Sequence, residues 1–188
     1  MLPRKIKKIL GWKKLFKSDQ TKGLNSSDLN SPEVPSWFRS QPGDTLQTEL
    51  GREGDIFLYV PWIREHGDSV IRRLSETGGL RFAAFDLVGN TESNSVRRAA
   101  ARFARDNPGL FRRMVLKRLI PLQSRVRAIV LTFDWAPFMR IIASACNELS
   151  IPTILIPHES VFVDSEKYYW DSTANASVPV CDFVLGWG

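Results

Sequence analysis

Residues 128–160 read AIVLTFDWAPFMRIIASACNELSIPTILIPHES and decide the fold. The apolar run at 128–133 predicts a strand. Pro137 then opens a segment whose apolar residues recur at helical spacing up to Leu149, and a second apolar run at 153–156 predicts another strand. Strands this continuously apolar are typical of a parallel sheet that is covered on both faces. The stretch therefore predicts one strand–helix–strand unit of such a sheet.

Polar and ionisable residues follow both of these strands. Asp134 and Trp135 come directly after the first, and His158, Glu159 and Ser160 come after the second. In open parallel sheets, ligands bind just beyond the carboxyl ends of the strands. We therefore expect a functional site at this edge of the sheet.

The rest of the chain continues the alternation of strands and helices. The further strands are predicted at 55–60, 81–85 and 182–185. The further helices are predicted at about 68–77, 92–105, 108–122 and 164–170. Such alternation implies βαβ units with right-handed crossovers. The predicted fold class is α/β, with a Rossmann-like parallel sheet flanked by helices.

The chain of 188 residues suits one domain with a tail. We expect a basic amphipathic segment at 1–17, a linker or irregular segment at 18–53 and the α/β domain at 54–188. Trp37 and Phe38 are expected to pack back onto that domain. No apolar run reaches the roughly 20 residues that span a bilayer, and the N-terminus lacks the apolar core of a secretory signal. A cytoplasmic location is therefore expected.

Basic residues gather in two zones of the chain, whose net charge is +6. Residues 1–17 hold seven Lys or Arg and no acid, and residues 97–127 hold ten against the single acid Asp106. Such zones indicate anionic partners, either membrane phospholipid or nucleic acid. Nucleic acid is the less favoured partner because no recognised nucleic-acid module accompanies the arginines. The preferred interpretation of 97–127 is a solvated helix face, or one that lies against acidic lipid.

The segment 1–17 is interpreted as a helix on the anionic inner leaflet, which would make the protein peripheral at the inner membrane. The expected membrane-binding residues are Lys5, Lys7, Lys8, Trp12 and Lys14. The alternative is a solvated basic tail, because Pro3 and Gly11 weaken a helix.

His158 and Glu159 are the main catalytic candidates. An imidazole and a carboxylate on a strand-end loop can act as a general base or bind sugar hydroxyls. Alternatively, the His bonds buried backbone groups and the Glu caps the next helix. Asp134 is a third catalytic candidate, or it caps the helix that Pro137 opens. The candidate substrate-binding residues are Asp86, Asn90, Trp135 and Ser160, although Asp86 and Asn90 also suit turns.

Several familiar signatures are missing from the sequence. It has no phosphate loop of the Walker type, no G-x-G-x-x-G after a strand and no G-x-S-x-G. The two His and two Cys residues are too few for a typical zinc site, so no metal is expected. Cys146 and Cys181 are expected to be buried and reduced. No cofactor is therefore expected to bind to this chain itself.

Two motifs near the end of the chain carry a family resemblance. The run IPTILIPHE at 151–159 is followed by a polar stretch and then by VCDFVLGWG at 180–188. This pattern resembles the N-terminal domain of bacterial capsule and surface-polysaccharide glycosyltransferases of the GT-B fold, in which a "gIPTv…qHG" strand end precedes an "aD.vl.wG" strand. Glu159 stands where the family usually has glycine, and the PHES variant is similar to transferases that act on acidic sugars such as Kdo.

The resemblance implies the acceptor-side domain of an enzyme that moves a sugar from a nucleotide-sugar donor to a growing capsule or lipopolysaccharide glycan. The donor would bind mainly to a C-terminal domain that this chain lacks, so the chain alone is expected to be inactive. Glu159 would be the general base, His158 would orient the glycan or glycolipid acceptor, and Asp134 matches the preceding strand end. The competing hypothesis is a non-catalytic α/β binding domain that docks through its basic zones on anionic membrane or nucleic acid.

Overall fold

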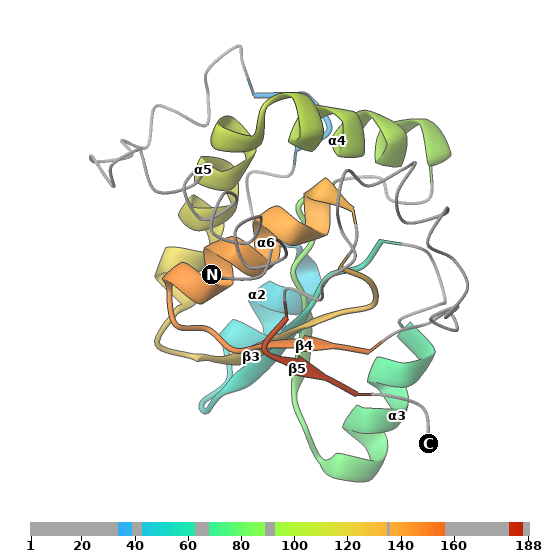
Figure 1. Ribbon diagram of the computed structural model, residues 1–188. Helices are drawn as coiled ribbons and strands as arrows, with labels where there is room; N and C mark the ends of the chain where they lie inside the picture. Colours follow the sequence, from blue (N-terminus) through green and yellow to red (C-terminus); the bar gives the residue numbers. More distant parts are fainter. Residues whose placement is uncertain are drawn as a thin grey trace, which may run out of the picture. The chain divides into compact units, whose positions relative to one another are not determined.

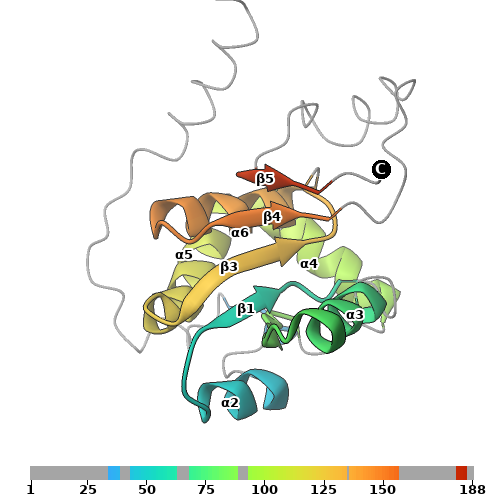
Figure 2. The ribbon, with the colours of Figure 1, turned by 90° about the horizontal axis from the view of Figure 1, so that it is seen from below.

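The computed structural model describes residues 34–38, 43–62, 68–88, 93–134, 136–156 and 181–185. Its strands form one five-stranded sheet in which all neighbours are parallel, in the order β2-β1-β3-β4-β5 (Figures 1 and 2). The strands are β1 (Ile56–Tyr59), β2 (Phe82–Ala84), β3 (Val126–Leu131), β4 (Thr153–Leu155) and β5 (Phe183–Val184). The predicted α/β class with a Rossmann-like parallel sheet is therefore confirmed.

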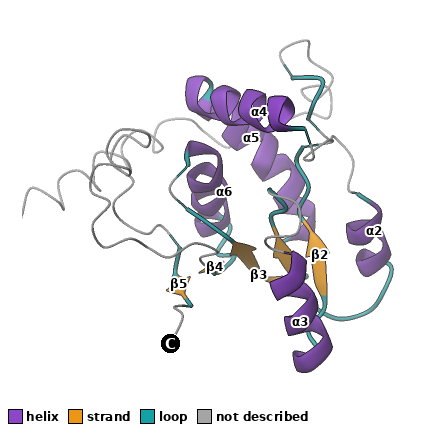
Figure 3. Cartoon of the chain, turned by 90° about the vertical axis from the view of Figure 1, so that its right-hand side faces the viewer, coloured by secondary structure: helices purple, strands orange, loops and turns teal. Residues whose placement is uncertain are grey.

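Helices cover both faces of the sheet (Figures 1 and 3). On one face lies α3 (Asp68–Gly78); on the other lie α5 (Pro108–Leu119) and α6 (Pro137–Glu148), with α4 (Asn94–Asp106) packed on both of them. The chain moves in one direction across the sheet from β1 to β2 and in the other from β2 to β3. Because crossovers in parallel sheets are right-handed, this reversal places α3 opposite the helices that follow β2.

The main core lies between the sheet and the α5–α6 layer. Phe111 of α5 and Phe138 of α6 are almost fully buried, with ring centroids 4.7 Å apart. A smaller cluster under α3 joins Ile71 to Val130 and Ile156 of the sheet. Each fully buried large apolar side chain contributes about 1.5–3 kcal/mol by leaving water, so this burial is the main stabilising term.

The short helix α2 (Asp44–Leu50) lies within the predicted linker or irregular segment 18–53 and corrects that prediction for these seven residues. It packs against β2, and Leu46 is fully buried. The expectation that Trp37 and Phe38 pack onto the domain is confirmed, because Phe38 is buried and forms a bridge with Val88. Trp37 makes an edge contact with the ring of Phe103 at 5.5 Å.

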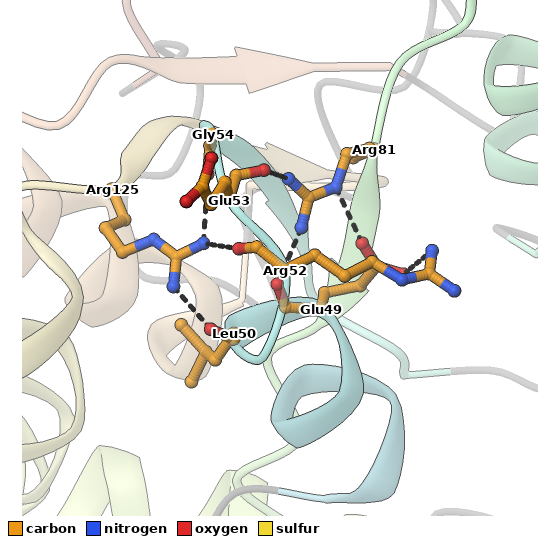
Figure 4. A network of polar contacts seen from close by, with 7 residues as sticks. All are labelled: Glu49, Leu50, Arg52, Glu53, Gly54, Arg81 and Arg125. Carbon is orange, nitrogen blue, oxygen red and sulfur yellow. Dashed lines mark hydrogen bonds and ion pairs between the residues drawn. The ribbon is translucent and has the colours of Figure 1, made fainter.

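Arg125, at the amino edge of the sheet, fastens the turn between α2 and β1 (Figure 4). Its guanidinium donates hydrogen bonds to the backbone oxygens of Leu50, at 2.6 Å, and Gly54, at 3.0 Å. A further bond reaches the backbone oxygen of Arg52. The positive charge also lies at the C-terminal end of α2, where the helix dipole favours a cation.

Arg81, which directly precedes β2, hydrogen-bonds to the same end of α2 (Figure 4). It donates to the Glu49 carboxylate at 2.8 Å and to the Glu49 backbone oxygen at 2.6 Å. It also donates to the backbone oxygen of Glu53. Hydrogen bonds that involve a charged group contribute about 1.5–3 kcal/mol each, so two arginines fix a segment that is too short to be stable alone.

The predicted basic amphipathic segment at 1–17 and the predicted helix at 164–170 lie outside the described residues. Within the described ranges, the helices are too short or too polar for any of them to cross a lipid bilayer.

Candidate functional site at the carboxyl edge of the sheet

The strand order reverses between β1 and β3, which are neighbours in the sheet. In open α/β sheets, such a reversal point is where ligands bind, beyond the carboxyl ends of the two strands. β1 ends at Tyr59 and is followed by Trp62, whereas β3 ends at Leu131 and is followed by Asp134. This edge is therefore the candidate site.

Asp134 is buried at this edge, with a relative exposure of 8%. Its backbone oxygen accepts a hydrogen bond from Nη1 of Arg140 at 3.4 Å. Burial lowers the pKa of the Arg140 guanidinium, and the charge of Asp134 opposes that effect. The N-cap residue of α6 is Ala136, two residues after Asp134, and its side chain makes no capping hydrogen bond. A buried carboxylate beside an arginine suits either a fixed hydrogen-bond acceptor or a structural ion pair.

Asp182 and Thr153 join the last two strands at the opposite end of β4. Thr153 is fully buried, and Oδ2 of Asp182 accepts hydrogen bonds from its backbone N–H and its hydroxyl, both at 2.8 Å. The backbone N–H of Asp182 donates in turn to Oγ1 of Thr153 at 2.9 Å. These three bonds set the register in which β5 adds to the sheet.

The two cysteines are free thiols close to this junction, Cys146 buried and Cys181 only partly buried. Burial raises the pKa of Cys181 to about 12, and the Asp134 carboxylate adds to this effect. Burial likewise raises the pKa of Cys146, and Cys181 contributes. A thiol that keeps its proton is a poor nucleophile and a poor metal ligand, so neither cysteine suits a catalytic role at neutral pH.

The raised pKa of Cys181 predicts a loss of stability in alkali. The folded thiol keeps its proton up to about pH 12, whereas the unfolded thiol loses it near 9.0, so the stabilisation is complete below pH 9.0 and is lost as the pH rises above it. We expect the free energy of urea unfolding to fall by about 1 kcal/mol at about pH 10 because of this thiol. The fall should be smaller in Cys181→Ser, which has no thiol at this position. An equally steep fall in that variant would contradict the assignment.

Asp86 follows β2, and its contacts give it a structural role. Its Oδ1 accepts a hydrogen bond from the backbone N–H of Gly43, the N-cap residue of α2, at 3.2 Å. The same oxygen lies 3.9 Å from Nη2 of Arg118, which is buried over the ring of Phe85. The carboxylate thus fastens α2 to the end of β2, and this explains Asp86 without a substrate.

Tyr59 and Asp68 form a pair at the carboxyl end of β1 that sequence reasoning did not identify. Burial raises the pKa of the Tyr59 hydroxyl, and Asp68, to which it is hydrogen-bonded, and Asp86 raise it further. A hydroxyl and a carboxylate held together can donate to and accept from a polyhydroxylated ligand. The sequence contained one sign of this pair, because Asp68 begins the helix that is predicted to follow this strand.

An aromatic cluster holds the ends of β1 and β3 to α6. The ring of Trp62 packs on Phe138 at 4.5 Å and on Phe133 at 6.2 Å. Trp62 is only half-buried, and it follows β1 at the candidate site. The cluster therefore fixes the loops that carry Asp134.

The other predicted site residues lie outside the described residues. They are His158, Glu159 and Ser160, together with Trp135 and Asn90, and the membrane-binding set Lys5, Lys7, Lys8, Trp12 and Lys14. The sheet register still relates two positions in sequence: Leu131 of β3 pairs with Leu155 of β4, and Asp134 and His158 each follow that pair by three residues. Within the described part of the chain, His, Cys, Asp and Glu side chains form no group that could hold a metal ion.

Comparison with known proteins gives no family assignment. No family model, curated protein or solved structure matches the chain. Function must therefore be argued from the fold and from the residues at the carboxyl edge.

Proposed function

We propose that the chain is the acceptor-side domain of a GT-B glycosyltransferase that moves a sugar from a nucleotide-sugar donor to a capsule or lipopolysaccharide glycan. One observation carries the proposal. Asp134 follows β3, the segment His158–Glu159 follows β4, and these parallel neighbours end at the same edge of the sheet. That edge is where α/β enzymes bind their ligands.

The proposed chemistry is sugar transfer with a general base. The carboxylate of Glu159 accepts the proton of an acceptor hydroxyl while the hydroxyl oxygen attacks the anomeric carbon of the donor sugar. The bond from that carbon to the nucleotide phosphate breaks, and the nucleotide leaves with the bonding electron pair. His158 orients the acceptor, and Asp134, held beside Arg140, provides a fixed hydrogen-bond acceptor. Trp135, Ser160 and Asn90 contact the acceptor. Asp86 is better explained by its bond to Gly43 than by substrate binding.

The donor would bind to a further lobe, and the outer strand β5 supports its existence. Phe183 and Val184 form this strand and Leu185 follows it, and the three are 58%, 47% and 51% exposed. Consecutive residues of a strand point to opposite faces, so both faces of β5 present apolar surface to solvent. Exposed apolar edge strands are normally covered by another element, as an adjoining lobe would do.

The second candidate function is a non-catalytic domain that docks on an anionic surface. The exposed arginines of α4 favour it, because they form a basic surface on this helix. A single protein could combine both functions.

The test is sugar transfer by the protein translated from the whole reading frame. Nucleotide sugars are offered together with lipid-linked glycan acceptors, and the products are analysed by mass spectrometry. Transfer of one sugar to one acceptor supports the proposal. A reading frame that stops at Gly188, with no turnover of any nucleotide sugar, would favour the binding domain instead.

A further inference from the structure

Helix α4 carries a row of arginines on the side that faces away from the rest of the domain. We name Arg98, Arg102 and Arg105 the arginine stripe; all three are exposed. They recur at intervals of four and three residues, so they lie along one side of the helix. α4 itself packs on α5 and α6 on the side away from the sheet, so the stripe lies on the outer surface of the domain (Figures 1 and 3).

The opposite side of α4 explains why the stripe is held rigidly. Ala100 and Ala104 are fully buried, and their small side chains allow close approach to the neighbouring helices. Phe103 makes an edge contact with the ring of Trp37, with the ring centroids 5.5 Å apart. Ser93 caps the helix, since its hydroxyl accepts a hydrogen bond from the Val96 backbone N–H at 3.5 Å. The arginines thus project from a fixed helix rather than from a loop.

The charge of the stripe is largely uncompensated. Asp106 is the single acid of α4 and lies 2.8 Å from Nε of Arg105, where both side chains are exposed. Exposed pairs of this kind contribute at most about 1 kcal/mol and are screened by salt. Arg98 and Arg102 belong to no ion pair among the described residues. Besides the hydrogen bond from Arg105, Arg102 also acts on the Asp106 carboxylate, whose pKa it helps to lower, so the three arginines outnumber this one acid and the stripe keeps a net positive charge.

We infer that the arginine stripe docks the domain on an anionic lipid surface. A row of positive charges along one outer helix can face a planar layer of anionic headgroups. Each arginine near such a surface contributes about 1 kcal/mol to the binding free energy. Single-stranded nucleic acid would also require well-exposed aromatic rings for base stacking, whereas Phe103, the one aromatic residue of α4, is half-buried and packs edge-on against Trp37.

The experiment measures binding of the full chain to phosphatidylcholine vesicles with and without phosphatidylglycerol. The wild type should bind only the vesicles that contain phosphatidylglycerol. Arg98→Gln/Arg102→Gln should bind these vesicles about 10- to 30-fold more weakly, as expected for the loss of two surface charges. Arg98→Lys/Arg102→Lys keeps the charges and should bind within about 3-fold of the wild type.

The matched control is Arg72→Gln/Arg73→Gln, which removes two exposed arginines from α3 on the other side of the sheet. This variant should bind like the wild type. Equal weakening in both glutamine variants would overturn the proposal, because binding would then depend on net charge alone. It would also be overturned if the α4 variant lost affinity for an RNA duplex but not for vesicles. None of these measurements depends on sugar transfer, so the result stands apart from the proposed enzymatic function.

Discussion

Glu159→Gln should reduce sugar transfer by about 10²- to 10⁴-fold in a protein that contains the donor-binding lobe. The amide has nearly the same size and can still accept a hydrogen bond, but it cannot take the proton from the acceptor hydroxyl. The loss should therefore appear in kcat, and the thermal unfolding temperature should hardly change. Initial rates with a saturating acceptor, together with a melting curve, make this measurement.

The matched control for this substitution is Glu76→Gln on the exposed surface of α3, which should leave transfer unchanged. Glu159→Asp keeps the carboxylate but withdraws it by one methylene, so an intermediate rate is expected. Transfer at the wild-type rate by Glu159→Gln would remove Glu159 from the mechanism. It would leave Asp134 as the candidate base.

Phe138→Ala should cost about 3–5 kcal/mol in the free energy of unfolding, the largest effect on stability that we expect. Phe138 is almost fully buried and contacts both Phe111 and Trp62, so its removal leaves a cavity where α6 meets the ends of β1 and β3. Urea unfolding of the purified chain measures the loss.

Two control variants show whether the loss of stability comes from this cavity or from the removal of any aromatic ring. Phe138→Leu retains most of the volume and should cost clearly less than Phe138→Ala. Phe183→Ala removes a ring that is 58% exposed and should change stability by no more than about 0.5 kcal/mol. A cost below about 1 kcal/mol for Phe138→Ala would mean that the aromatic cluster does not support the carboxyl edge.

The order of the elements could be predicted because apolar runs determine where buried strands lie. The strand predicted at 128–133 is β3 at Val126–Leu131, two residues earlier. The apolar pattern does not reveal that the strand begins at Val126, because the exposed Arg127 interrupts the apolar run. Arg127 pairs with Asp55 at 2.6 Å. A predicted strand boundary therefore differs from the observed one where a single residue of an otherwise buried strand faces solvent.

Helix α2 could not be predicted from its own sequence. Asp44–Leu50 is mostly polar, and Leu46 is its one buried residue. Its partners are distant in the chain: Asp86 holds its first turn, and Arg81 and Arg125 hold its last. A seven-residue helix forms here because tertiary contacts stabilise it, which a local pattern does not reveal.

The candidate site was predicted in part. Strand ends show in sequence where polar residues stop an apolar run, and this identified Asp134. The Tyr59–Asp68 pair and the arginine beside Asp134 depend on how the chain folds back across β1 and α6, so spacing alone does not reveal them. Asp86 shows the converse case, because its position suggested substrate binding but its contacts are internal.

Arg125 and Arg81 hydrogen-bond to backbone oxygens of the turn, and this determines which residues of the turn can vary. Every residue type presents the same carbonyl group, so Arg52 and Glu53 can be exchanged without loss of the acceptors that the two arginines use. Gly54 is an exception, since its φ of +92° favours glycine. Saturation mutagenesis should thus find that Arg52 and Glu53 accept most residue types, whereas Gly54, Arg81 and Arg125 do not.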